Sequence, residues 1–253
     1  MKLLFVADVF GPAGRRIVEE RLRPLRDELG VDFCVVNGEN VADGSGITPK
    51  LADKLLAAGA DVITLGNHTW RREGIGPYLE RSDRVIRPAN QASSAPGRGL
   101  AIVDGVAVIN LIGSLFLDTP VAAWEVVDGL VEEARARTSV VLVDFHAEAT
   151  SEKIAMARWL DGRVTAVLGT HTHVQTNDAR LLPGGTAALT DAGMTGPHDS
   201  VIGVEAELAI RRMRTGLPVR FQPAEGGVRL EGALVECDAN GRATAIETVR
   251  VRT

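Results

Sequence analysis

The sequence contains few cysteines and no long hydrophobic run. Only Cys34 and Cys237 occur among 253 residues, each in an apolar, strand-like stretch. Neither belongs to a Cys-x-x-Cys pair, so we expect reduced core cysteines rather than thiolate metal ligands or a disulfide framework. No stretch approaches the ~20 apolar residues of a membrane span. We therefore predict a cytoplasmic protein with no membrane partner.

A basic excess is also missing. The 28 Lys and Arg residues are outnumbered by 33 Asp and Glu, which gives a net charge of −5. This balance argues against an extended nucleic-acid surface. It is compatible with a small anionic substrate, because bound cations would add positive charge that the sequence count omits. Without a linker, repeat or low-complexity tract, residues 1–253 are expected to form a single domain, and a homo-oligomer is compatible with this composition.

The chain does contain apolar runs that end in polar residues. Such positions at the carboxyl ends of parallel strands are favoured ligand sites, and right-handed crossovers place them side by side. The alternative for the first of them, Asp8, is that it caps the following helix. Three runs occupy the first part of the chain: residues 2–7 followed by Asp8, residues 32–36 followed by Glu39 and Asn40, and residues 61–65 followed by Asn67 and His68.

Helical and strand patterns alternate along the chain. Pro24 is expected to kink or restart the first helix, which ends at Gly30, and Thr48 with Pro49 makes a suitable start for the second. Because a purely doubly wound sheet would not end in three antiparallel strands, we predict the α/β class with two mixed sheets and helices outside. The later predicted elements are a hairpin over 100–103 and 106–112, helices over 122–136, 151–160 and 205–214, and strands over 139–145, 165–168, 186–190, 218–222, 227–236 and 242–252.

Residues 168–174, Leu-Gly-Thr-His-Thr-His-Val, place two of the five histidines two positions apart behind an apolar run. An extended segment repeats its side-chain direction every second residue, so His171 and His173 are expected to aim at one point. Neutral imidazoles suit Zn, Fe, Mn and Ni. The alternative is a polar strand end with solvated histidines. A further histidine, His146, follows the predicted strand 139–145.

The order of these blocks resembles the calcineurin-like metallophosphoesterases, whose pattern runs Asp-x-His, Gly-Asp, Gly-Asn-His, a lone His and Gly-His-x-His. Two departures distinguish this chain, since Phe10 replaces the first histidine and Glu39 replaces the bridging aspartate. Asn40 is the candidate that replaces the lost ligand. With residues 66–70, 144–150 and 191–197, these departures are similar to the YmdB-type subgroup over nearly the whole chain.

The resemblance implies a four-layer α/β/β/α sandwich, a dinuclear metal centre and phosphodiesterase activity on cyclic nucleotides, most of all 2′,3′-cyclic nucleotides. A bridging carboxylate holds two cations ~3.5–4 Å apart, and a hydroxide that bridges them attacks phosphorus. Without thiolates, the donor set suits Fe or Mn and permits Zn or Ni. Glu39 would be the bridge, with Asp8, Asn40 and His173 completing one site and Asn67, His146 and His171 the other.

His68 is the family histidine without a metal role, and the resemblance makes it the general acid that protonates the leaving alkoxide. The alternative is a structural histidine behind Asn67. The sequence offers Asp43 as a candidate to orient His68, and His198 is expected to be a solvated loop histidine. Three further residues either line the site or brace it: Trp70, Glu148 and Asp191.

Two other functions fit the same residues. A phosphomonoesterase would use the same two-metal core, since the walls of the site decide which ester fits. A regulatory protein would bind metal and nucleotide but turn over slowly. The complete ligand set together with His68 argues against this second alternative.

Overall fold

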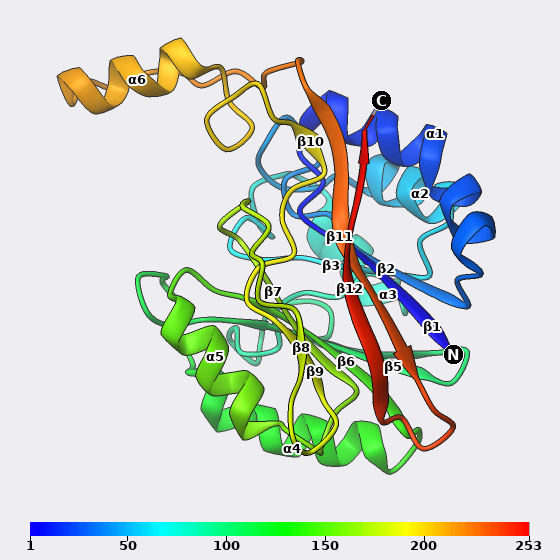
Figure 1. Cartoon of the computed structure of the whole chain (residues 1–253). Coiled ribbons are helices and arrows are strands. Elements are labelled where there is room, and N and C mark those ends of the chain that lie inside the picture. The colour runs from blue at the N-terminus through cyan, green and yellow to red at the C-terminus, as the bar shows by residue number, and fades with distance from the viewer. Residues whose placement is uncertain (253) are drawn as a thin grey trace.

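The computed structural model describes residues 1–252, which form four layers in the order α/β/β/α (Figure 1). Two six-stranded sheets pack face to face, with helices on their outer faces. Leu3, Phe5 and Leu142 belong to the apolar core between the sheets. Separate cores lie between each sheet and its helices. The predicted α/β class and four-layer architecture are confirmed.

The first sheet contains the amino-terminal strands and the carboxyl-terminal hairpin. Its order is β10-β11-β1-β2-β3, with β12 paired to β11. The first three strands along the chain are parallel, and β11 runs antiparallel to β1. The bounds are β1 Lys2–Val6, β2 Phe33–Asn37, β3 Val62–Thr64, β10 Gly196–Pro197, β11 Val228–Cys237 and β12 Ala243–Arg252.

The second sheet has the order β4-β5-β6-β7-β9-β8. Its four central strands are parallel, whereas each edge strand is antiparallel to its neighbour. The predicted hairpin is the β4–β5 pair. The bounds are β4 Leu100–Val103, β5 Val106–Ile112, β6 Val140–His146, β7 Ala166–Thr170, β8 Arg180–Leu181 and β9 Ala187–Leu189.

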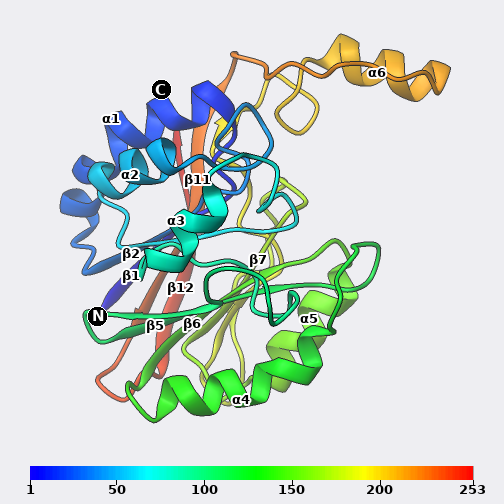
Figure 2. The same cartoon turned by 180° about the vertical axis from the view of Figure 1, so that it is seen from behind.

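The helices cover the outer faces of both sheets (Figure 2). Pro24 lies inside α1 without dividing it, and Gly30 ends that helix in a left-handed conformation. Thr48 caps α2 by accepting a hydrogen bond from the Leu51 amide, as expected. The first sheet carries α1 Gly11–Leu29, α2 Pro49–Ala58 and α3 Ile75–Arg81, and the second carries α4 Ala123–Arg135 and α5 Thr150–Trp159.

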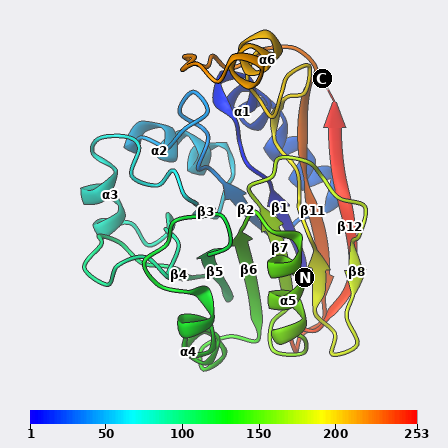
Figure 3. The ribbon, with the colours of Figure 1, turned by 90° about the vertical axis from the view of Figure 1, so that its left-hand side faces the viewer.

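The helix α6 (Ala206–Thr215) projects outside the four layers (Figures 1 and 3). Residues 218–222, predicted as a strand, instead form an irregular return from this helix. Pro218 lacks a backbone donor, and the return has no sheet beside it, so the apolar pattern there does not produce a ladder. Within residues 1–252, no helix has the length and apolar character needed to cross a membrane.

Candidate metal centre

The eight predicted site residues lie together where strands of both sheets end. In the first sheet, Asp8 follows β1 and two residues follow each of β2 and β3. In the second sheet, His146 is the last residue of β6, while His171 and His173 follow β7. The sheets pack so that these ends face one another. The residues from β2 and β3 are Glu39 and Asn40, then Asn67 and His68.

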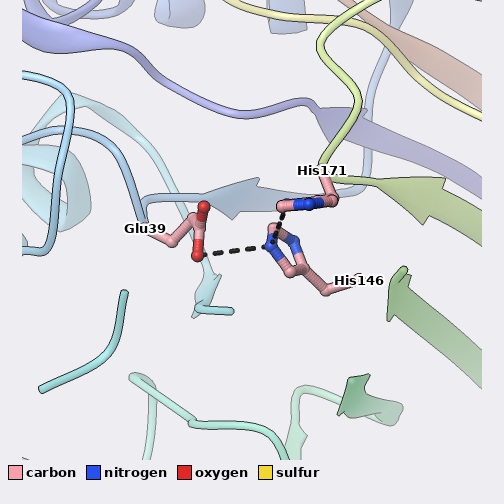
Figure 4. Close-up of side chains that lie close together, drawn as sticks. All are labelled: Glu39, His146 and His171. Atoms are coloured by element: carbon pink, nitrogen blue, oxygen red, sulfur yellow. Dashed lines mark hydrogen bonds and ion pairs between the residues drawn. The ribbon is translucent and has the colours of Figure 1, made fainter. Parts of the chain in front are cut away.

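Three of these side chains converge on the imidazole of His146. Its Nε2 lies 3.3 Å from Glu39 Oε2, 2.9 Å from Asn67 Oδ1 and 3.1 Å from His171 Nδ1. One ligand atom each from Glu39, His146 and His171 lies within 4.8 Å of the others, and Figure 4 shows the three side chains pointing toward a common centre. Carboxylate, amide and imidazole donors in this arrangement form a pocket suited to a transition-metal ion.

A hydrogen-bond chain sets the orientation of His146. The carboxylate of Asp144 accepts hydrogen bonds from Asn37 Nδ2 at 2.9 Å, Thr64 Oγ1 at 2.5 Å and Thr170 Oγ1 at 2.7 Å. Because Thr170 uses its proton on Asp144, it accepts from His146 Nδ1, 2.9 Å away. The chain thus places a proton on Nδ1 of His146 and leaves Nε2 as the atom that would bind a metal ion at the centre.

The charges of this cluster are strongly coupled. Burial is the largest single influence and disfavours charge on both His146 and Glu39, but their attraction and hydrogen bond, together with the other charges around them, outweigh it. Glu39, with Asp8 and Asp144, raises the pKa of His146 to about 9, and His146 with His68 holds the pKa of Glu39 well below its usual range. Burial and the neighbouring His146 lower the pKa of His171 to about 3. A metal ion at the cluster would take the place of the His146 proton.

Asp8, Asn40 and His173 form the second part of the centre. Asp8 Oδ2 accepts a hydrogen bond from the His171 amide at 2.9 Å, whereas the buried Asp8 Oδ1 and Asn40 Oδ1 have no hydrogen-bond partner within residues 1–252. His173 Nδ1 donates to the Ile202 carbonyl at 3.0 Å, which leaves Nε2 as the atom available to a metal. Buried unpaired oxygens are costly in a protein interior, and a cation would satisfy them.

Phe10, which replaces the usual histidine, closes one side of this second part. Its buried ring contacts the His173 ring edge-on, with 5.7 Å between centroids. A phenyl ring supplies no ligand atom, so Asn40 is the oxygen donor available at this position. The exchange of ligands expected from the sequence stays a prediction.

Glycine is required at position 66, where the chain passes directly over the candidate ligands Glu39 and His146. A Cβ there would lie 2.3 Å from Glu39 Oε2 and 2.5 Å from His146 Nε2. Any side chain would therefore displace both groups. The Gly66-Asn67-His68 turn brings its backbone against the centre so that the two following side chains enter it.

His68 lies beside Glu39, the candidate bridging residue, rather than behind Asn67. Its Nδ1 is 3.3 Å from Glu39 Oε1 and 3.2 Å from Asn40 Nδ2, and its side chain is one quarter exposed. Asp43, offered by the sequence as the orienting acid, instead pairs with Arg15 and is largely exposed. Glu39 and Asn40 are the groups that orient His68. The loop geometry around residues 40–46 could not be predicted from the sequence.

The His171–His173 segment is not extended, which corrects the geometric basis of the prediction. Both histidines have positive φ, 98° and 62°, so they converge through a turn after β7 rather than through strand alternation. Asp191 holds this turn, since its Oδ2 accepts hydrogen bonds from Thr172 N at 3.1 Å and Thr172 Oγ1 at 2.6 Å. Lys153 Nζ pairs with the same buried oxygen at 2.7 Å.

The other side chains that the sequence singled out have separate places. Glu148 contacts His171 Nε2 at 3.0 Å and so lines the centre. Trp70 donates its indole proton to Gln91 and is partly exposed. His198 was predicted to be solvated, which is wrong. Its side chain is mostly buried, and its Nε2 donates to the Met194 carbonyl at 3.0 Å.

Comparison with known proteins identifies the family of this chain. The model of the family described as YmdB-like protein matches residues 4–249. The chain belongs to the YmdB-like family. The resemblance to YmdB-type metallophosphoesterases is therefore confirmed. The 2′,3′-cyclic-nucleotide 2′-phosphodiesterase of Bacillus subtilis (strain 168) is 44% identical over 256 residues, which cover 99% of this chain and 97% of the relative.

Two crystal structures show the same YmdB-like fold over the full chain. A hypothetical protein from Thermus thermophilus superposes with a TM-score of 0.92 at 40% identity, covering 100% of this chain and 99% of that one. A novel phosphatase from Mycoplasma pneumoniae gives 0.91 at 34% identity, covering 100% and 93%.

The YmdB-like site also depends on residues to which the sequence analysis assigned no role. Asp144 and Thr170 orient His146, and Lys153 neutralises the acid that holds the His171–His173 turn. A carboxylate inside the apolar run 139–145, two residues before His146 and so on the same strand face, is the signal that could have identified Asp144.

Proposed function

We propose that this YmdB-like protein is a metal-dependent phosphodiesterase that hydrolyses 2′,3′-cyclic nucleotides in the cytoplasm. The observation that carries the proposal is the set of buried donor atoms that converge on one centre, above all Asp8 Oδ1, Asn40 Oδ1 and the Nε2 face of His146. The printed activity of the Bacillus subtilis relative supports the substrate class.

The donor atoms divide into two metal sites that share Glu39. Its two carboxylate oxygens already face different neighbours, Oε1 toward His68 and Oε2 toward His146. One site would use Asn67, His146 and His171, which lie around the Oε2 oxygen. The other would use Asp8, Asn40 and His173. Asp8 joins the two sets through the His171 amide.

Oxygen and imidazole donors without thiolate suit Fe or Mn, and Zn or Ni are compatible. Bound metal ions would supply a hydroxide nucleophile near neutral pH and neutralise charge on the phosphoryl group. The protein's own contribution is to hold the ligands in place. Thr170 keeps the His146 proton on Nδ1, and Asp191 keeps the turn that presents His171 and His173.

His68 would move the proton that the reaction requires. When the phosphorus–oxygen bond to the ribose breaks, the leaving oxygen needs a proton, and an imidazole is suited to give it near neutral pH. The position of His68 on the pocket wall, one quarter exposed and beside Glu39, allows contact with both substrate and solvent. Asn40 and Glu39 limit its rotation.

A phosphomonoesterase is the second candidate, because a Mycoplasma pneumoniae structure of this fold is described as a phosphatase. One experiment separates the two. Metal content of the purified protein is measured, followed by hydrolysis of a 2′,3′-cyclic nucleotide and of the corresponding nucleoside monophosphate. The proposal predicts about two metal equivalents and faster turnover of the cyclic diester. Metal-free protein with undiminished activity, or turnover of the monoester alone, would contradict it.

A further inference from the structure

The pocket over the metal centre is larger than a phosphate group requires. It has a volume of about 460 Å³ and is lined by Glu39, Asn40 and His171 among other residues. Another wall of the pocket comes from the base of the α6 arm, here defined as residues 203–224. Cavities of this size typically bury a small organic ligand rather than a lone anion.

Two backbone hydrogen bonds around an isolated antiparallel bridge, Val204 with Pro223, form a short stem that fixes the arm to the pocket. The Glu205 amide donates to the Gln222 carbonyl at 3.0 Å, and the Ala224 amide donates to the Gly203 carbonyl at 2.9 Å. These bonds hold the return segment, including Phe221 and Gln222, at the rim of the pocket. The arm beyond the stem projects away from the layers (Figure 2).

Phe221 presents an aromatic surface to this pocket. The Arg212 guanidinium lies over its ring, 5.2 Å from the centroid, and the side chain is 40% exposed. Because Arg212 covers one face, the opposite face and the ring edge remain for contact with a ligand. The other phenyl ring in the pocket wall, Phe10, is buried against His173 and cannot take this part.

Gln222 adds a hydrogen-bonding group next to the ring. Its carbonyl is used in the stem, whereas its side-chain amide is exposed and has no protein partner among residues 1–252. A carboxamide offers both donors and an acceptor. An aromatic face with an adjacent carboxamide is the combination that binds a nucleobase by stacking and edge contacts.

We propose that Phe221 and Gln222 form a nucleobase subsite, with the base stacked on the free face of Phe221 and its edge bonded to the Gln222 amide. This inference rests on the proposed function, because it assumes that the phosphodiester occupies the metal centre beside Glu39 and His68. The arm is then a substrate-binding element. A stacked purine gains more contact than a pyrimidine, so adenine and guanine nucleotides are the preferred class.

The test compares Phe221→Ala and Phe221→Trp with wild type on two cyclic diesters. One is 2′,3′-cyclic AMP, and the other is glycerol 1,2-cyclic phosphate, which has the same five-membered diester but no base. In Phe221→Ala the ratio of kcat/KM for the nucleotide to that for the glycerol ester falls about 10-fold, mainly through KM, as expected for one lost stacking contact. Phe221→Trp restores the ratio.

Met213→Ala is the matched control, since Met213 is a 77% exposed apolar residue of the same arm that does not line the pocket. It should leave the ratio unchanged. An unchanged ratio in Phe221→Ala, or equal losses in Met213→Ala, would overturn the subsite.

Calorimetry distinguishes failure of the subsite from failure of the proposed function. If wild type hydrolyses neither diester, the proposed function fails, but binding of adenosine 3′-monophosphate still tests the subsite. The subsite requires about 10-fold weaker binding to Phe221→Ala than to wild type and Met213→Ala. Equal dissociation constants for the three proteins would overturn it.

Discussion

The two sheets bring different atoms to the same centre. The first sheet supplies carboxylate and amide oxygens, from Asp8 after β1 and from residues after β2 and β3. The second sheet supplies imidazole nitrogens, from His146 at the end of β6 and from His171 and His173 after β7. Each of the two proposed metal sites would take ligands from both sheets. Metal binding would therefore depend on how the sheets pack.

A hydrogen-bond network between the two sheets aligns them beneath the centre. Asp144 of β6 accepts hydrogen bonds from Asn37 of β2 and Thr64 of β3. Asn37 in turn accepts from the Glu39 backbone amide at 3.1 Å, so the same network positions a candidate ligand from each sheet. Buried and fully hydrogen-bonded, this network favours one packing of the sheets over others.

The largest expected effect comes from Glu39, the residue that the two proposed metal sites share. Glu39→Ala should lose both metals and reduce activity at least ~10³-fold, because several kcal/mol of charge stabilisation would disappear. His171→Ala and His173→Ala should each lose about one metal equivalent. Elemental analysis and circular dichroism of the variants check this. Equal metal loss in all three would contradict the division into two sites.

Unlike the other imidazoles of the centre, which come from the second sheet, His68 comes from the first sheet. His68→Ala should keep both metals yet slow hydrolysis of a 2′,3′-cyclic nucleotide by ~10²–10⁴-fold. A nitrophenyl ester should recover much of the rate, since nitrophenolate leaves without a proton. Steady-state kinetics on both substrates measure the difference. The same loss on both substrates, or loss of metal, would remove His68 from the role of acid.

A smaller effect should follow from a change that weakens the orientation of His146, an imidazole of the second sheet. Thr170→Val breaks the chain from Asp144 to His146 and should lower metal affinity ~10–100-fold, as changes behind metal ligands commonly do. Thr165→Val is the matched control, because this buried hydroxyl donates to the Gly241 carbonyl, away from the centre. Metal titration should show a change only in the first variant. A similar shift in both would indicate a general loss of stability.

The smallest effect is expected from the cysteines. Cys34 lies in β2 of the first sheet, where burial raises the pKa of its thiol and keeps it neutral. Cys34→Ser should leave metal content and kcat unchanged and cost ~1–3 kcal/mol of stability through a buried hydroxyl. Denaturant unfolding and metal analysis check both parts. Metal loss with folding retained would make a thiol part of the centre.

The sequence predicts the placement of the candidate ligands of the first sheet well, because each polar residue closely follows a buried run. Asp8, Glu39 and Asn67 lie at strand ends as expected, and the parallel arrangement brings them together. The partner that orients His68 could not be predicted, since it depends on the path of the loop after β2. Asp43 points to Arg15 instead.

The second sheet shows where sequence periodicity is insufficient. The histidines after β7 were correctly chosen for a strand end, but their convergence depends on positive φ angles held by Asp191, a residue from a distant segment. Likewise, the helix of residues 205–214 was predicted, whereas its projection and the irregular return 218–222 were not. Local patterns do not specify which tertiary neighbour an element has.

Anomalous diffraction from crystals of the protein loaded with manganese tests the central claim most directly. Two peaks that share Glu39 are expected, each with ligands from both sheets. One lies among Asn67, His146 and His171, and the other among Asp8, Asn40 and His173. A single peak, or a peak bound by residues of one sheet only, would contradict it.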